Sequence, residues 1–270
     1  MRNYYYWIIS SIFFTYMLIF IGGLVRVSGA GLGCPDWPKC FDSWIPPISI
    51  DQIPQHIDSN LFNFRLAWTE YINRLFGAVT GIVISVTLFK SYKFRSVDYK
   101  SFLIILSAFI LTCIEGVLGG LVVKSYLKPA IVSLHLLLAF IIISLLIYAF
   151  VRIRCKRKNF KENFMLSNHY NIKILLFIWC IVVFEVLLGT QMREGIEVLI
   201  REFPEISSST VLSLLGAFKY VHTGVGFLLL GCVYKLYKYR FEQIENKLIF
   251  RLIVSTYYIV IFQIAIGEFM

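Results

Sequence analysis

Two long apolar segments without charge constrain this chain more than any other feature. Residues 3–25 and residues 129–151 each hold 23 residues with no Asp, Glu, Lys or Arg. A helix of that length crosses about 30 Å of hydrocarbon. Further apolar stretches cover residues 71–89, 102–123, 174–192, 211–234 and 252–267. Irregular backbone cannot face lipid, so the sequence predicts an all-α, polytopic transmembrane helical bundle with seven spans.

The charges of the loops indicate how such a bundle is oriented. The first segment is too long for a signal peptide, so we interpret it as a retained helix. If the N-terminus is cytoplasmic, inner segments hold 17 of the 26 Lys and Arg residues and outer segments hold 9. This is the positive-inside pattern of membrane proteins. The net charge of +10 therefore does not indicate nucleic acid, not even at the basic residues 152–161 between two spans.

A glycine-rich loop follows the first span and carries two cysteines, Cys34 and Cys40. On the predicted topology this loop is on the outer side, where oxidising conditions permit a disulfide. A pair of free thiols or a metal clip is the alternative, although no histidine or third cysteine lies nearby.

Small sequence patterns recur in alternate spans and predict duplicated helix pairs. In the odd spans a glycine near the outer end follows a longer side chain by four residues: Leu18 and Gly22, Glu115 and Gly119, Glu185 and Gly189, Gln263 and Gly267. In the even spans a polar residue precedes a small one by four: Asn73 and Gly77, His135 and Ala139, His222 and Gly226. Glycine there lets a helix or a flat cofactor approach the backbone.

The repeats predict two four-helix halves, residues 1–155 and 156–270. Seven of the expected eight helices are visible in the sequence. An eighth would follow a further outer loop, and the chain stops at Met270 before one.

His135 and His222 are the strongest candidates for chemistry, because ionisable residues inside a membrane are costly and usually functional. His135 lies six residues after Pro129, about 9 Å along its helix. Neutral imidazole is a strong axial ligand of haem iron. A structural hydrogen bond to a neighbouring helix is the alternative. The chain has no CxxCH motif, so a haem would be held non-covalently.

Several charged residues could support such a site. Glu70 and Arg74 are four residues apart, on the helix face that also carries Asn73; they form either an interfacial ion pair or an acid/base group facing a cofactor. Glu115 and Glu185 lie deeper and need partners or protonation, for helix packing or for catalysis.

Arg26 and Arg193 stand near the outer ends of their spans. Their guanidinium groups could bind haem propionates in bidentate fashion. Alternatively, both side chains are anchors that reach towards the membrane surface.

Together these motifs resemble the haem A synthase family over nearly the whole chain. The most specific parts are residues 22–38, 70–77 and 189–193, with His135 and His222. The resemblance implies an eight-helix membrane enzyme of two similar halves. The amino-terminal half would bind haem O as substrate, and the carboxy-terminal half would bind haem b as cofactor. One methyl of haem O would become a formyl group through successive hydroxylations and loss of water.

The resemblance also implies location and partners. The enzyme would lie in the bacterial cytoplasmic membrane with its haems near the outer face. Its product would serve haem-copper terminal oxidases, so haem O synthase and oxidase assembly proteins are expected partners. The family's outer-loop cysteines can form a disulfide, which corresponds to Cys34 and Cys40. No motif identifies the electron donor.

Residue roles follow from the same resemblance. His135 would ligate the substrate haem and His222 the cofactor haem, while Arg26 and Arg193 would orient propionates. Glu70 would support proton transfer or iron ligation.

Two departures from the family pattern stand out. Asn73 occupies a position where the family usually has histidine, which leaves His135 to ligate from one side. The family partner of His222 belongs to the eighth helix. A non-catalytic haem-binding or oxidase-assembly protein, and a transporter with a polar pathway of glutamates, are the alternative functions.

Overall fold

A computed structural model of the chain describes residues 2–157, 169–203, 205, 208–241 and 247–269. The chain divides into two compact units, Met1–Phe164 and Met165–Met270. Helices dominate both units, and no β-strand forms among the described residues. The predicted all-α class is therefore confirmed.

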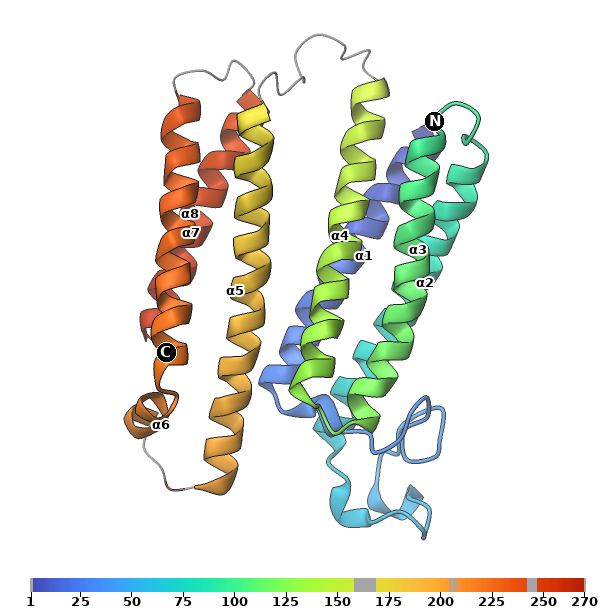
Figure 1. The fold of residues 1–270 in the computed structure, drawn as a ribbon. Coiled ribbons are helices and arrows are strands. Elements are labelled where there is room, and N and C mark those ends of the chain that lie inside the picture. Colours follow the sequence, from blue (N-terminus) through green and yellow to red (C-terminus); the bar gives the residue numbers. More distant parts are fainter. Residues whose placement is uncertain (1, 158–168, 204, 206–207, 242–246, 270) are drawn as a thin grey trace. The chain divides into compact units, whose positions relative to one another are not determined.

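The first unit is a four-helix bundle of α1 (Arg2–Val27), α2 (Phe64–Tyr92), α3 (Tyr99–Lys124) and α4 (Pro129–Arg157). Helices α1 and α3 each pack against both α2 and α4 (Figure 1). The connections from α2 to α3 and from α3 to α4 are short, so neighbouring helices run antiparallel. The long connection, residues 28–63, lies at the end of the bundle where α1 ends and α2 begins (Figure 1). We call this the loop end.

Capping side chains determine where the helices of this bundle begin. Asn63 accepts a hydrogen bond from the backbone amide of Leu66 (3.2 Å) and starts α2. The helix therefore begins seven residues before the apolar stretch 71–89, and Glu70 lies on it as predicted. Helix α4 begins at Pro129, a favourable first helical residue because its missing N–H has no partner there anyway.

The hydrophobic core of the first unit is concentrated away from the loop end. One cluster contains Ile8 of α1, Ile105 of α3 and Ala149 of α4. A second cluster, which contains Ile84 of α2 and Leu146 of α4, lies nearer the middle of the helices. Inside a membrane, close van der Waals packing of these side chains holds the helices together, because the surrounding lipid is itself apolar.

The second unit contains α5 (His169–Glu202), α6 (Ser208–Leu214), α7 (Ala217–Phe241) and α8 (Lys247–Phe269). Helix α7 packs against both α5 and α8. The core of this unit consists of buried residues from these three helices: Ile181, Leu229, Val233 and Val260.

Two predicted boundaries in the second unit are wrong. The span expected at residues 211–234 is interrupted, because Gly216 adopts a left-handed conformation (φ +57°) and ends the seven-residue α6. The long helix starts only at Ala217. Helix α5 continues ten residues past the expected end at residue 192 and stops two residues before Pro204, which disfavours helix in the residue that precedes it.

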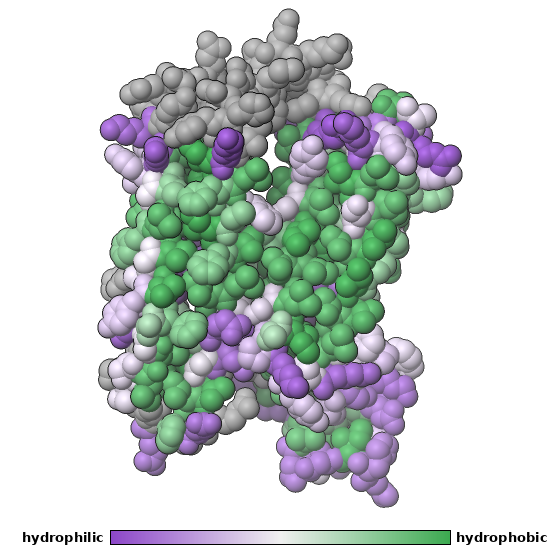
Figure 2. Space-filling model, viewed as in Figure 1, coloured by the Kyte–Doolittle hydropathy of each residue, from purple (hydrophilic) through white to green (hydrophobic). Residues whose placement is uncertain are grey.

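The described helices are those of an integral membrane protein. Six of them, α1 to α5 and α7, are long and apolar enough to cross a membrane. The seventh predicted span corresponds to the shorter apolar segment Phe250–Ile266 of α8. On the visible face of each unit, hydrophobic residues cover the middle of the helices and hydrophilic residues gather towards their ends (Figure 2).

Candidate functional site

The disulfide loop, residues 28–47, is folded against the loop end of the first unit. Cys34 and Cys40 form a disulfide, and both residues are almost completely buried, with exposed fractions of 0% and 1%. They pack with Phe41 against Ala67 of α2. The disulfide is thus part of a small core that joins the loop to α2.

Glu70 binds the backbone of this loop from α2. Its side chain is only 4% exposed. Its Oε2 accepts a hydrogen bond from the amide of Cys34 (2.8 Å), and its Oε1 accepts one from Arg74 Nε (3.1 Å). Both carboxylate oxygens therefore have partners. Glu70 lies in a buried ion pair at the loop, and its predicted role in proton transfer or iron ligation stays a prediction.

Arg74 completes the attachment of the loop. Its Nη1 donates to the carbonyl oxygens of Asp36 (3.0 Å) and Lys39 (2.8 Å), while its Nη2 donates to Glu70. Within the loop, a hydrogen bond from Lys39 lowers the pKa of Asp42. The sequence indicated the Glu70–Arg74 pair, but it gave no signal that the pair binds the backbone of a distant loop.

Two glycines let the loop approach the helices closely. A Cβ atom on Gly33 would lie 2.3 Å from the carbonyl oxygen of Leu66 in α2. A Cβ atom on Gly120 of α3 would lie 2.7 Å from the indole ring of Trp37. The backbone of Leu66 occupies the space that a side chain at residue 33 would need, and the ring of Trp37 occupies the space that a side chain at residue 120 would need.

His135 of α4 lies over two residues of α3. Its Nδ1 is 3.2 Å from Glu115 Oε1, and its Cε1 would be 3.6 Å from a Cβ atom on Gly119. The histidine side chain is 35% exposed and that of Glu115 is 13% exposed. Neither Nδ1 nor the second carboxylate oxygen, Oε2, makes a hydrogen bond of regular geometry with described residues. The pair is a close electrostatic contact inside the predicted span.

His222 of α7 repeats this arrangement in the second unit. Its Nδ1 is 3.1 Å from Glu185 Oε1 on α5, and its Cε1 would be 3.6 Å from a Cβ atom on Gly189. A Cβ atom on Gly226 would lie 3.3 Å from Glu185 Oε1, so this glycine leaves room for the carboxylate. The predicted helix-pair repeat therefore recurs as a repeated contact between side chains.

Asn73 of α2 occupies the corresponding position in the first helix pair. Its Oδ1 would be 3.9 Å from a Cβ atom on Gly22 of α1. Leu18 stands where the other two pairs have glutamate. The buried Oδ1 of Asn73 has no hydrogen-bond partner among the described residues. This helix pair keeps the packing at the glycine and lacks the carboxylate–imidazole contact.

The layer of the first unit that contains Asn73 and His135 differs from the rest of the bundle in how deeply its side chains are buried. No residue is buried in the four helix segments 16–24, 71–79, 109–119 and 134–141, all of which the structure describes. Buried residues lie on both sides of this layer. The side chains of this layer are therefore less buried than those on either side of it.

Arg26 and Arg193 are half-buried, and each lies four residues after a glycine of the repeat. Arg26 belongs to the last turn of α1 and follows Gly22, while Arg193 follows Gly189 within α5. Both residues are therefore on the helix face that carries the glycine. Their predicted contact with propionates stays a prediction.

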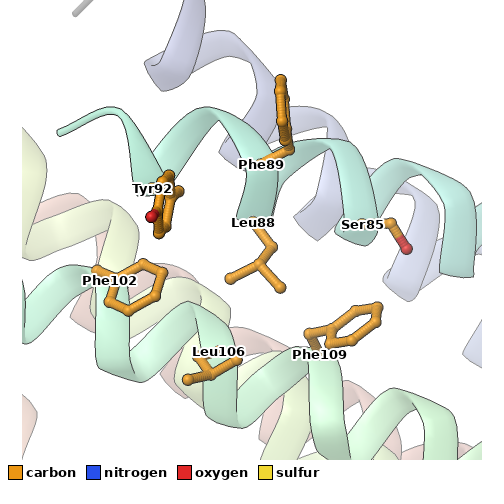
Figure 3. Close-up of a pocket in the computed structure, with 7 residues that line it drawn as sticks. All are labelled: Ser85, Leu88, Phe89, Tyr92, Phe102, Leu106 and Phe109. Atoms are coloured by element: carbon orange, nitrogen blue, oxygen red, sulfur yellow. The ribbon is translucent and has the colours of Figure 1, made fainter. Parts of the chain in front are cut away.

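A pocket of about 270 Å³ lies elsewhere in the first unit, between α2 and α3. Leu88 and Phe89 of α2 and Leu106 and Phe109 of α3 are among its lining residues (Figure 3). These residues belong to the helix ends that residues 93–98 join, opposite the loop end. The pocket is apolar and contains none of the predicted site residues.

A family model described as cytochrome oxidase assembly protein (COX15-CtaA) matches residues 5–269, nearly the whole chain. The chain belongs to this family. Family membership agrees with the resemblance that the sequence motifs indicated, and it does not favour the transporter alternative.

Curated relatives of the cytochrome oxidase assembly family carry a more specific name. A protein of Shewanella oneidensis named "Heme A synthase" is 33% identical over 148 residues, which are 53% of this chain and 44% of that protein. Two proteins with the same name, from Rickettsia felis and Rickettsia africae, are each 28% identical over 169 residues, or 55% of this chain and 50% of theirs. The match thus spans about half the length of these relatives. No solved structure matches the chain.

The residues of this family member fit a haem by their chemistry. Haem iron takes imidazole as an axial ligand, and each unit presents one histidine beside a helix glycine. A flat macrocycle needs a slot between helices, and the first unit has a layer without buried side chains at the level of His135. The buried, unpartnered Oδ1 of Asn73 lies in the same layer. His135 and His222 belong to different units.

The sequence pointed to Glu115 and Glu185 but not to their partners. Their position four residues before a glycine was visible, as was the position of each histidine in the next long span. Which residue of one helix meets which residue of its neighbour depends on helix register, and the repeat alone does not specify it.

Proposed function

We propose that this chain acts in haem A biosynthesis and oxidises a methyl group of haem O to a formyl group. The observation that carries the proposal is the repeated site, in which an intramembrane histidine lies over a helix glycine in each of the two units. Family membership and the name of the curated relatives agree with it. Bound haem supplies redox chemistry at its iron, and the residues of the chain bind and orient it.

On this proposal the first unit binds haem O and the second binds haem b. His135 and His222 are the protein ligands of the two irons. Arg26, at the end of α1, binds the propionates of the haem in the first unit. Arg193, on α5, binds those of the haem in the second unit. Asn73 leaves the substrate iron without a second histidine in the first unit. The electron donor is a separate partner.

We further propose that the loop end faces the outer side of a bacterial cytoplasmic membrane, with the N-terminus in the cytoplasm. The excess of Lys and Arg in the opposite loops supports this orientation. The Cys34–Cys40 disulfide supports it too, because disulfides persist in oxidising compartments.

The activity is tested by expressing the full chain in bacteria that make haem O but have no haem A synthase of their own. Extracted haems are separated by chromatography and identified by mass. Haem A in the wild-type extract supports the proposal, and the H135A and H222A variants should yield none. If the purified protein binds haem but haem O is never converted, the chain is a haem-binding assembly protein. If it binds no haem, the proposal is wrong.

A further inference from the structure

The two glutamate–histidine contacts are nearly identical although they lie in different units. The Nδ1–Oε1 distances are 3.2 Å for His135 and Glu115 and 3.1 Å for His222 and Glu185. In both units the histidine Cε1 would be 3.6 Å from a Cβ atom on the glycine one turn further along the glutamate helix. The same atoms meet in both units, so the contact is a feature of the repeat.

The two histidine rings are oriented in the same way relative to the glutamate and the glycine. Nδ1 is the ring nitrogen that lies close to the carboxyl oxygen, without a hydrogen bond of regular geometry, and Cε1 is the ring atom closest to the glycine. Nε2 is therefore the ring nitrogen for which neither contact supplies a partner. A neutral imidazole carries one proton and has one nitrogen free to bind a metal. A carboxyl oxygen beside Nδ1 favours the proton at Nδ1 and leaves the Nε2 lone pair free.

The first helix pair shows that the two residue types change together. Where α1 has Leu18 in place of glutamate, α2 has Asn73 in place of histidine. The packing is otherwise similar, since Asn73 Oδ1 approaches Gly22 as the imidazoles approach their glycines. A glutamate that only filled space between helices would not have to disappear with the histidine.

We propose that Glu115 and Glu185 are positioning residues, each of which holds its histidine in the Nδ1–H tautomer with Nε2 directed at a haem iron. This inference rests on the proposed function for the identity of the metal group. Hydrogen bonds from ligating histidines to carboxylates are a general way of fixing ring orientation and raising ligand basicity. The role requires that the carboxyl oxygen beside Nδ1 accepts a hydrogen bond, as a carboxylate oxygen does.

Because Gly226 has no side chain, the carboxyl group of Glu185 has room to reach His222. A Cβ atom at this position would lie 3.3 Å from Glu185 Oε1. A larger side chain there would press on the carboxyl oxygen that contacts His222. The sequence spacing of His222 and Gly226 thus serves the glutamate, in addition to any flat group that approaches α7.

The first test needs no haem. The full chain is labelled with ¹⁵N-histidine, reconstituted in lipid bilayers, and its imidazole signals are recorded at neutral pH; H135N and H222N variants assign them. We expect the Nδ1–H tautomer for both residues in the wild type. E115L should shift only the His135 signals, and E185L only those of His222. Unchanged tautomers in both leucine variants would overturn the proposal.

The second test uses bound haem and separates a positioning role from a packing role. E115Q and E185Q keep the size and an acceptor oxygen but remove the charge, so they should retain haem while its midpoint potential rises. E115L and E185L should lose at least half of the haem from their own unit. E202Q, on an exposed residue of α5, is the matched control.

The outcomes distinguish this inference from the proposed function. Wild-type protein without haem would overturn the proposed function, and the tautomers would still decide whether the glutamates position the rings. Wild-type protein with haem whose midpoint potential and content do not change in any of the four glutamate variants would overturn the inference alone.

Discussion

Glu70 and Arg74 lie one helical turn apart on α2, and together they bind the disulfide loop at three backbone groups. Glu70 accepts from the amide of Cys34, and Arg74 donates to the carbonyl groups of Asp36 and Lys39. The pair is buried, in contrast to the exposed ion pairs that contribute little to stability. It attaches the loop to the bundle through charge-assisted hydrogen bonds.

Removing one member of this pair should destabilise the protein strongly. E70A leaves Arg74 buried without its carboxylate, and R74A removes the donor to two loop carbonyls and to Glu70 Oε1. Loss of one partner of a buried ion pair costs about 3–5 kcal/mol. Thermal unfolding in detergent should show the loss for each single variant, while the double variant should cost less than the sum. R65A, an exposed arginine on the same helix, is the control and should have no effect.

The membrane-spanning helices followed from composition, but their boundaries did not. Long apolar segments are visible in any window of the sequence, because a span must be apolar along its length. The start of α2 depends on one capping hydrogen bond from Asn63, and the interruption before α7 depends on one left-handed glycine, Gly216. Such local features change a boundary by several residues without altering the hydropathy of the segment.

Part of the candidate site was predictable for a similar reason. The repeat identified His135 and His222 as equivalent, and the structure places both in the same contact with a helix glycine. The loop that covers Glu70 was not predictable, because residues 34 to 40 return to α2 through turns that no periodicity specifies. Long-range contacts of this kind depend on the shape of the folded loop.

The disulfide should stabilise the loop by a moderate amount. The ring closed by Cys34 and Cys40 is short, with a sequence separation of 6, and loop-closure entropy gives about 2 kcal/mol for a ring of this size. The C34S/C40S double variant should therefore unfold at a lower temperature. Maleimide labelling with and without reductant should find two fewer reducible thiols. C113S, at an exposed free cysteine, should leave both readouts unchanged; equal stability of the double variant would contradict the role assigned to the disulfide.

Alanine substitutions should rank the glycines by the atoms that surround them. Gly33→Ala places a Cβ atom 2.3 Å from the carbonyl oxygen of Leu66, and backbone cannot move aside without displacing the loop. Gly120→Ala meets the ring of Trp37, a side chain with more freedom to shift. Gly23→Ala meets nothing within 4 Å and should be neutral or stabilising by about 0.5–1 kcal/mol, because alanine favours helix. Thermal unfolding of the three variants measures the order, and a Gly33 variant as stable as the wild type would contradict it.

Asn73→His should alter the first haem site in a way that spectra can detect. A Cβ atom on Gly22 would lie 3.9 Å from Asn73 Oδ1. In the other two helix pairs, a Cβ atom on the glycine would lie 3.6 Å from the histidine Cε1. The similar distances indicate that α1 leaves space for an imidazole. On the proposed function, the new imidazole would be a second histidine ligand for the substrate haem, and the absorption spectrum should shift towards that of a low-spin haem. Because the family usually has histidine at this position, conversion of haem O should continue in the variant. Asn73→Leu controls for loss of the amide alone, and an unchanged spectrum in the histidine variant would show that Asn73 does not face the iron.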